Sequence, residues 1–133
     1  MSLVVDASAL VAALVDTGPD GEWAEATIAG QVLAAPHLLL VEAANILRRS
    51  KLAGDISTDV AALAHADLLD LRVELFPYGP FADRVWALGD NLTSYDGWYV
   101  ALAEDLDAPL ATLDRRLARA PGPTCRFVVP PAC

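Results

Sequence analysis

The sequence predicts an α/β fold with a mostly parallel central sheet. Short apolar runs typical of strands alternate along the chain with longer segments of helical periodicity. Strands that alternate with helices are joined by right-handed crossovers, which place helices on both faces of a parallel sheet. No internal repeat, low-complexity tract or interdomain linker divides the 133 residues, so we expect one domain over residues 1–133.

The first half of the chain is expected to form two strands and four helices. Strands are predicted over 3–5 and 31–35, the second ending at Pro36. Helices are predicted over 7–15, 22–29, 37–52 and from about 57 to 71. Gly54 ends the third helix. Ser57 or Asp55 can cap the fourth, because a side-chain oxygen there can accept from first-turn N–H groups.

The second half is expected to form three strands and three helices. Strands are predicted over 72–77, 109–113 and 126–130, the last at an edge of the sheet. Helices are predicted over 78–90, with Pro80 in the first turn, over 94–106, capped by Ser94, and in a short segment after Asp114.

Composition and charge exclude several classes of protein. Hydrophobic residues make up 55% of the chain, which excludes a disordered protein. The formal net charge of −9 argues against a protein that coats DNA or an anionic membrane, although a nucleic acid held locally stays compatible. Cys125 and Cys133 are too few for a disulfide framework, and no signal peptide precedes Asp6, so we expect a cytoplasmic protein.

Two aspartates stand where predicted strands end. The apolar run of "LVVDASAL" stops at Asp6, and that of "PLATLDRRL" stops at Asp114. In open α/β sheets, ligand sites lie outside the carboxyl ends of the strands. Both carboxylates are therefore candidates for one site.

Two further acids lie in strongly apolar helices. Glu42, in "HLLLVEAANILRR", shares a narrow polar stripe with Asn45 and Arg49, and a charge there is costly to bury without a partner. Asp96 lies near the start of "SYDGWYVALAEDL", where the helix dipole favours a carboxylate, and on the face that points inward. With the two strand-end aspartates, these acids are expected to converge at one end of the sheet.

Four convergent carboxylates repel one another, and a divalent cation removes that conflict. Oxygen ligands with no His or Cys nearby favour Mg²⁺ or Mn²⁺ over Zn²⁺. Taken singly, each acid also has an ordinary structural explanation: Asp6 and Asp114 cap helices, Asp96 is a first-turn acid, and Glu42 pairs with Arg49. The cation site is favoured for the set, because Glu42 has no capping role and the two strand ends point the same way.

Three segments, "VVDASAL", "VEAANIL" and "SYDGWYVALAEDLDAPLATLDRRL", resemble the PIN-domain ribonucleases, and most closely the VapC-type toxins of bacterial toxin–antitoxin pairs. The resemblance covers essentially the whole chain. It implies a PIN-like α/β/α sandwich, a Mg²⁺- or Mn²⁺-dependent endoribonuclease, a homodimer and a small antitoxin that blocks the site. An antitoxin side chain inserted among the four acids is expected to be basic, because a guanidinium can bridge two carboxylates.

The resemblance also assigns roles to individual residues. The metal-site acids are Asp6, Glu42, Asp96 and Asp114, and the polar residues that support them are Ser8, Asn45 and Thr112. Either Glu42 or Asp114 takes the proton from the attacking water, and the sequence leaves this choice open. Gly97 stands where relatives often carry Ala, which is expected to loosen that helix start. Arg115 and Arg116 stand where some relatives have a further carboxylate, so the number of metal ions is also open.

Basic residues gather beside two of the four acids. Six of the nine Lys and Arg residues follow them, Arg48, Arg49 and Lys51 after Glu42 and Arg115, Arg116 and Arg119 after Asp114. This indicates an RNA backbone held near Arg49, Arg115 and Arg116, although charges near a helix C-terminus also complement the dipole. Trp86, Trp98, Tyr95 and Tyr99 can stack on unpaired bases, although such residues more often belong to a core.

Other classes of protein fit less well. A haloacid-dehalogenase-type phosphatase requires a second aspartate where this chain has Ser8, and a receiver-type signalling domain requires paired acids and a late lysine. A non-catalytic or housekeeping PIN-like RNA-binding module remains the alternative to the enzyme, and metal-dependent RNA cleavage separates the two.

Overall fold

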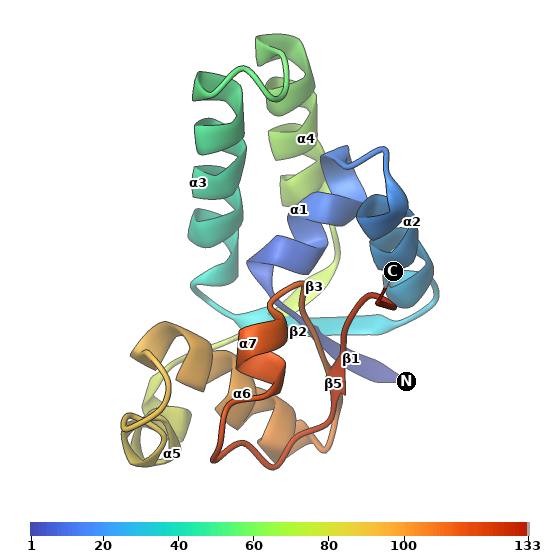
Figure 1. Cartoon of the computed structure of the whole chain (residues 1–133). Helices are drawn as coiled ribbons and strands as arrows, with labels where there is room; N and C mark the ends of the chain where they lie inside the picture. Colours follow the sequence, from blue (N-terminus) through green and yellow to red (C-terminus); the bar gives the residue numbers. More distant parts are fainter. Residues whose placement is uncertain (133) are drawn as a thin grey trace.

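Five parallel strands form one sheet at the centre of the structure, a computed structural model that describes residues 1–132 (Figure 1). The strands are β1 (Ser2–Val5), β2 (Val32–Pro36), β3 (Val73–Phe76), β4 (Leu110–Ala111) and β5 (Phe127–Val128). Every pairing between neighbouring strands is parallel, which confirms the predicted sheet. Cys133, the second of the two cysteines, lies outside the described residues.

The strand order, β3-β2-β1-β4-β5, reverses direction at β1. The chain adds β2 and β3 on one side of β1, then returns to the other side to add β4 and β5. Right-handed crossovers put connections of opposite direction on opposite faces of a sheet. The gap between β1 and β4 is therefore the topological switch point, where open α/β sheets bind their ligands.

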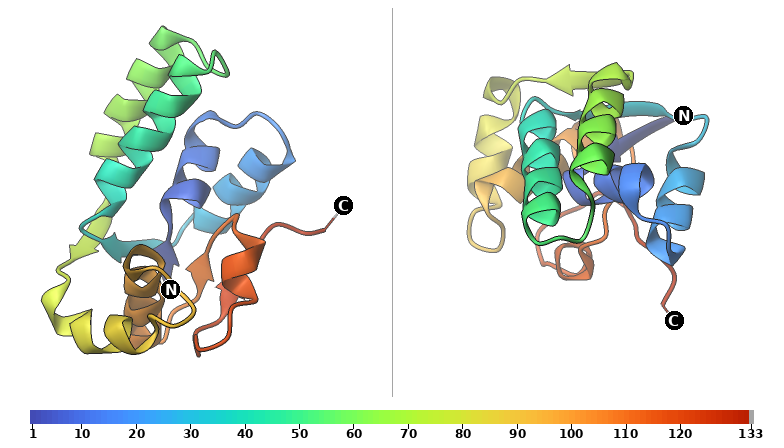
Figure 2. Two further views of the ribbon diagram at one scale, coloured as in Figure 1. Left: turned by 60° about the vertical axis from the view of Figure 1, so that its left-hand side comes forward. Right: turned by 90° about the horizontal axis from the view of Figure 1, so that it is seen from above.

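Helices cover both faces of the sheet, as the sequence predicts (Figure 1). One face carries α1 (Ala7–Val15), α2 (Pro19–Ile28), α3 (Leu39–Leu52) and α4 (Thr58–Asp70), and the other carries α5 (Ala82–Ala87) and α6 (Ser94–Leu106). A 3₁₀ turn, η1 (Gly79–Phe81), precedes α5, and a short helix, α7 (Arg115–Ala118), joins β4 to β5. Helices α3 and α4 lie side by side and extend away from the sheet (Figure 2).

Several helices begin at positions other than those predicted. Helix α2 starts at Pro19, because Gly18 is its N-cap and proline suits the first helical position. Helix α3 starts at Leu39, after a turn at 37–38. The cap of α6 is Thr93 instead of Ser94: the Thr93 side chain accepts a hydrogen bond of 3.2 Å from the backbone N–H of Asp96. Ser57 caps α4, one of the two caps expected.

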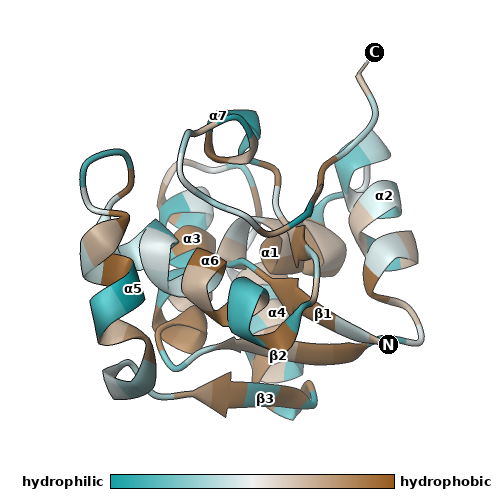
Figure 3. Cartoon of the chain, turned by 90° about the horizontal axis from the view of Figure 1, so that it is seen from below, coloured by the Kyte–Doolittle hydropathy of each residue, from teal (hydrophilic) through white to brown (hydrophobic). Residues whose placement is uncertain are grey.

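The core lies between the sheet and the two helical layers. Val4 and Leu110 of the central strands are fully buried, and so are Leu10 of α1 and Val100 of α6. Figure 3 shows hydrophobic residues along β1 and β2, which lie inside the molecule. No helix within residues 1–132 combines the length and the apolar character needed to cross a bilayer.

Candidate active site

The two strand-end aspartates lie on either side of the topological switch point. Val5, at the end of β1, pairs with Ala111 at the end of β4, and the backbone N–H of Asp6 donates to the Ala111 carbonyl at 3.1 Å. Asp6 follows β1 directly, and Asp114 follows β4 after two intervening residues. Both carboxylates therefore stand at the same edge of the sheet.

Two hydroxyl groups connect these strand ends. Asp6 Oδ1 accepts from Ser8 Oγ at 2.7 Å, and Asp6 Oδ2 accepts from Thr112 Oγ1 at 2.5 Å. Each hydroxyl oxygen also accepts from the backbone after β4: Ser8 Oγ from Leu113 at 3.1 Å and Thr112 Oγ1 from Asp114 at 2.9 Å. The hydroxyls of Ser8 and Thr112 thus hold Asp6 in a fixed position relative to the segment that carries Asp114.

Helices α3 and α6 bring the other two acids to the same edge. Glu42 lies in the first turn of α3 and Asp96 in the first turn of α6. Glu42 Oε1 accepts a hydrogen bond of 2.7 Å from the hydroxyl of Tyr99, which is only 2% exposed. A buried tyrosine hydroxyl needs a hydrogen-bond partner, and Glu42 supplies it across the gap between the two helices.

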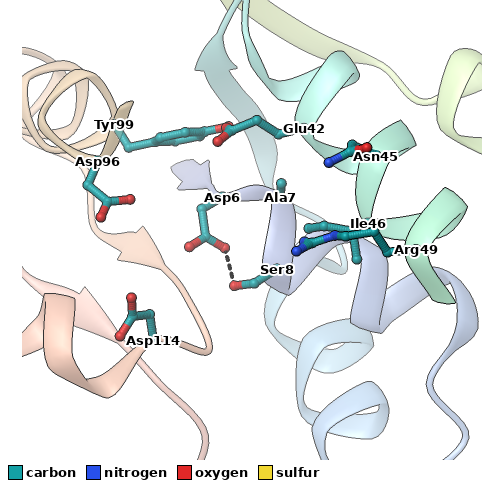
Figure 4. A pocket seen from close by; sticks show the side chains of 10 residues that line it. All are labelled: Asp6, Ala7, Ser8, Glu42, Asn45, Ile46, Arg49, Asp96, Tyr99 and Asp114. Atoms are coloured by element: carbon teal, nitrogen blue, oxygen red, sulfur yellow. Dashed lines mark hydrogen bonds between the residues drawn. The ribbon is translucent and has the colours of Figure 1, made fainter. Parts of the chain in front are cut away.

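All four acids line one pocket of about 400 Å³ (Figure 4). Its other lining residues are Ala7, Ser8, Asn45, Ile46, Arg49 and Tyr99. Thr112 is fully buried, is not among the lining residues, and is linked to the pocket through its hydrogen bonds with Asp6 and with the backbone N–H of Asp114. The convergence expected from the sequence is therefore present, with acids contributed by the ends of two strands and the starts of two helices.

Burial and mutual repulsion raise the pKa of three of the acids. Burial is the main cause for Asp6, and the charge of Asp114 adds to it, against the opposing effect of the hydroxyl hydrogen bonds. Burial also raises the pKa of Glu42, with smaller contributions from Asp96 and Asp6. For Asp96, burial comes first and the charges of Asp114 and Asp6 follow. Each of these three acids therefore lies close enough to at least one other carboxylate for that charge to raise its pKa.

The donor set of the pocket fits a hard divalent cation. The residues that line it offer carboxylate, amide and hydroxyl oxygens and include neither His nor Cys. In Figure 4 the carboxylates of Asp6, Asp96 and Asp114 point toward a common space. Within residues 1–132, however, no three His, Cys, Asp or Glu side chains lie close enough to share an ion as they stand. Because hydrogen bonds hold Asp6 in place, binding of a cation would require the other side chains to move toward it.

The capping explanation for the strand-end aspartates is also correct. Asp6 Oδ1 accepts from the backbone N–H of Ala9 at 2.9 Å and caps α1, and Asp114 Oδ1 accepts from the N–H groups of Arg116 and Leu117 and caps α7. By contrast, the proposed pair of Glu42 with Arg49 is absent: the salt bridge found within residues 1–132 joins Arg84 to Glu104. Capping and site formation are compatible, because a carboxylate has several acceptor positions.

The three arginines predicted to contact RNA lie in different surroundings. Arg49 lines the acidic pocket, on the side opposite Asp96 (Figure 4). Arg116 is exposed and lines an adjoining pocket of about 340 Å³, which shares Asp96 and Asp114 with the first. The Arg115 guanidinium instead donates to the carbonyl of Pro130. Arg115 therefore anchors the segment after β5, while the other two arginines face the pockets.

Tyr99 and Gly97 have roles that the sequence interpretation missed. Tyr99 was assigned to the core or to base stacking, yet its hydroxyl binds Glu42. Its position three residues after Asp96, on the same face of an apolar helix, was the available signal. A Cβ on Gly97 would lie 3.2 Å from Cγ1 of Val85, so this glycine lets α6 begin in close contact with α5. The close contact gives Gly97 a packing role beside the expected loosening of the helix start, which stays a prediction.

Comparisons with known proteins agree with this arrangement. The PIN domain family matches residues 3–123. Ribonuclease VapC1 of Mycobacterium tuberculosis is 42% identical over 125 residues, which cover 93% of this chain and 94% of that protein. Among solved structures, PAE2754 from Pyrobaculum aerophilum is 26% identical with a TM-score of 0.68, covering 89% of this chain and 78% of that one. The structure of VapBC2 from Rickettsia felis bound to a promoter DNA fragment has the same fold, with 16% identity, a TM-score of 0.64 and coverage of 98% and 100%. As its motifs predict, the chain belongs to the PIN domain family and, within it, to the VapC ribonucleases.

Proposed function

We propose that this protein is an endoribonuclease that hydrolyses RNA phosphodiester bonds with the help of Mg²⁺ or Mn²⁺, and that it acts as the toxin of a toxin–antitoxin pair. One observation carries the proposal: four carboxylates from separate segments line a single pocket at the topological switch point. The ribonuclease names of its relatives support RNA as the substrate. No cofactor other than a divalent cation is needed for such a hydrolysis.

Asp6, Asp96 and Asp114 are the residues that would hold the cation, and Glu42 lines the same pocket beside them. When bound, the cation polarises a phosphoryl oxygen and lowers the pKa of a coordinated water. Asp6 is the fixed member of the set, because hydrogen bonds from Ser8, Thr112 and the Ala9 N–H occupy both of its oxygens. A ligand held in this way needs little rearrangement on binding, and such supporting contacts are worth about 10- to 100-fold in metal affinity or activity.

Glu42 and Asp114 are the two candidates for accepting the proton from water. Glu42 has a raised pKa, chiefly through burial, and accepts one hydrogen bond, from Tyr99. A base with a raised pKa is better matched to neutral pH than an ordinary carboxylate. We therefore propose that Glu42 accepts the proton from water and that Asp114 binds the cation.

Arg49 and Asn45 form the wall of the pocket opposite Asp96 and contact the substrate. Arg49 has no carboxylate partner among residues 1–132 and lies in an otherwise acidic pocket. Its guanidinium can bind a phosphate oxygen, which offsets the repulsion between RNA and the acids. Asn45, next to it on the polar stripe of α3, can donate a further hydrogen bond from its amide.

The same acidic pocket suits an inhibitory side chain. A guanidinium from an antitoxin can bridge two of the carboxylates and take the place of the cation. Val41, Leu63 and Leu69 on α3 and α4 are more than half exposed and provide apolar surface for an amphipathic segment of the same antitoxin. We also propose that the chain forms a homodimer, which sedimentation of the purified protein tests directly.

The test of the proposed function is a cleavage assay with single-stranded RNA. We expect cleavage with Mg²⁺ or Mn²⁺, none in EDTA, and a loss of at least 100-fold in Asp96→Asn. Asp59→Asn, an exposed first-turn acid of α4 outside the pocket, is the matched control and should cleave as the wild type does. Equal cleavage by Asp96→Asn, or full cleavage in EDTA, contradicts the site. RNA binding with no cleavage under any metal condition favours the non-catalytic module.

A further inference from the structure

Trp86 is the most exposed aromatic residue of the described chain. Its side chain, near the end of α5, is 84% exposed, although tryptophan is among the residues most costly to leave in water. The sequence interpretation favoured a core position for it, and the structure contradicts that expectation. Single exposed apolar residues are common on protein surfaces, so the surroundings of Trp86 decide whether it has a role.

Trp86 lines a hollow that is related to the acidic pocket through residues shared with a pocket between them. The hollow has a volume of about 390 Å³ and is lined by Trp86, Asp90, Leu92, Thr93 and Ser94, among others. Leu92 and Thr93 also line the neighbouring pocket that contains Arg116. That pocket in turn shares Asp96 and Asp114 with the acidic pocket. Shared lining residues thus place three hollows in sequence between the candidate active site and the indole ring.

Arginine side chains line the first two hollows but not the third. Arg49 and Arg116 line the first two hollows and can contact phosphates. The third has no Lys or Arg among its lining residues and includes Asp90, so it disfavours a phosphate. An uncharged planar ring is accepted there, and aromatic side chains bind unpaired bases by stacking on their faces.

The helix that carries Trp86 is held against the helix that carries Asp96. Its helix, α5, is attached to α6 through Arg84, whose Nε donates to Glu104 at 2.7 Å. At the other end of the contact, Gly97 lets Val85 approach the first turn of α6, which carries Asp96. The indole therefore belongs to helix α5, which packs directly against α6, the helix that carries Asp96.

We propose that the hollow at Trp86 is a subsite for one unpaired RNA base, stacked on the indole ring, on the strand that leads to the cleaved phosphate. This inference rests on the proposed ribonuclease function, because it takes RNA as the ligand. Stacking supplies affinity that does not depend on charge, which a protein with a net charge of −9 needs when it binds a polyanion. It also tolerates any base, since every base has a π face.

The experiment measures binding of a short single-stranded RNA to the whole chain in Ca²⁺ and in EDTA, with gels to check for cleavage. We expect Trp86→Ala to weaken binding about 10-fold, within the ~5- to 150-fold range for one stacked base, without changing the salt dependence. Trp86→Phe should retain most of the affinity and lose most of the RNA-induced fluorescence quenching. Leu52→Ala, an exposed apolar side chain at the end of α3 that lines none of these hollows, should bind as the wild type does.

An RNA that contains abasic positions provides the second arm. If a base stacks on Trp86, removing that base weakens wild-type binding but does not weaken binding by Trp86→Ala any further. Unchanged affinity of Trp86→Ala, or quenching that persists in Trp86→Phe, overturns the subsite. A change in sedimentation with no change in RNA affinity also overturns it and assigns Trp86 to a protein contact. Binding is measured without turnover. A protein that binds RNA but does not cleave it would therefore contradict the proposed enzyme activity and leave the subsite intact.

Discussion

Thr112 donates a hydrogen bond of 2.5 Å from Oγ1 to Oδ2 of Asp6. Thr112 Oγ1 also accepts a hydrogen bond of 2.9 Å from the backbone N–H of Asp114, so one hydroxyl connects the two strand-end acids. Thr112 is the fully buried polar side chain among the described residues. Its burial means that water cannot replace the hydroxyl if it is removed.

Thr112→Val should therefore weaken both the fold and the site. The isosteric change leaves Asp6 Oδ2 and the Asp114 N–H without their partner, at a cost of about 1–3 kcal/mol in the free energy of unfolding. Urea unfolding measures this loss. Thr112→Ser keeps the hydroxyl and is the matched control. Equal stability of the valine variant and the wild type would show that the contact contributes nothing.

Tyr99→Phe tests the assignment of Glu42 as the base. The hydrogen bond from Tyr99 lowers the pKa of Glu42, against the larger effect of burial, so its loss should raise that pKa. The acidic limb of the pH profile of kcat/KM should then move to higher pH, while stability falls by about 0.5–1.5 kcal/mol. A stability loss with an unmoved acidic limb would transfer the base role to Asp114.

The arginines should differ in their effect on the salt dependence of RNA binding. Arg49→Ala and Arg116→Ala should each reduce the log–log slope by roughly 0.7, because each removes one phosphate contact with a single strand. Arg115→Ala should leave the slope unchanged and lower the melting temperature, since this guanidinium donates to Pro130. A reduced slope for Arg115→Ala would show that Arg115 contacts RNA.

The raised pKa values predict an unusual stability profile for the metal-free protein. Because Asp6, Glu42 and Asp96 bind protons more readily in the folded state, stability is present below their ordinary pKa and is lost as pH rises through the raised values. The melting temperature in EDTA should therefore increase from pH 7 to about pH 5, just above the ordinary carboxyl range.

Asp96→Asn should flatten this profile and raise the metal-free melting temperature at pH 7, because it removes one of the repelling charges. Glu104 contributes in the opposite sense: burial acts to raise its pKa, but hydrogen bonds from Arg84 and Thr124 lower it. Its stabilisation is lost only as pH falls below the ordinary range of Glu, so it does not mask the effect. A wild-type profile that falls between pH 7 and 5 would contradict the proposed repulsion.

The sequence was sufficient for the sheet and for the convergence of the acids. Asp6 and Asp114 stand at strand ends, and a parallel sheet brings such ends to one edge. Glu42 could be selected because a carboxylate within an apolar segment needs a polar partner, although the later start of α3 places it in the first turn and not in the middle of the helix. These inferences depend on local pattern, which single-sequence reasoning detects well.

Contacts between segments that are distant in the chain could not be predicted from the sequence. The Tyr99–Glu42 hydrogen bond joins residues 57 positions apart, and the Thr112–Asp6 bond joins residues 106 apart. The exposure of Trp86 and the role of Gly97 depend on how closely α5 packs on α6, which no periodicity encodes. Arg115 and Arg116 are neighbours in sequence, yet only the fold decides that one binds Pro130 and the other faces the pocket.

Anomalous diffraction from crystals grown with Mn²⁺ tests the central claim most directly. We expect an anomalous peak in the pocket within bonding distance of carboxylate oxygens from Asp6, Asp96 and Asp114, with Asp96 and Asp114 moved toward Asp6, and no such peak in Asp96→Asn. A wild-type pocket that stays empty at saturating Mn²⁺, while the same preparation cleaves RNA, would contradict it.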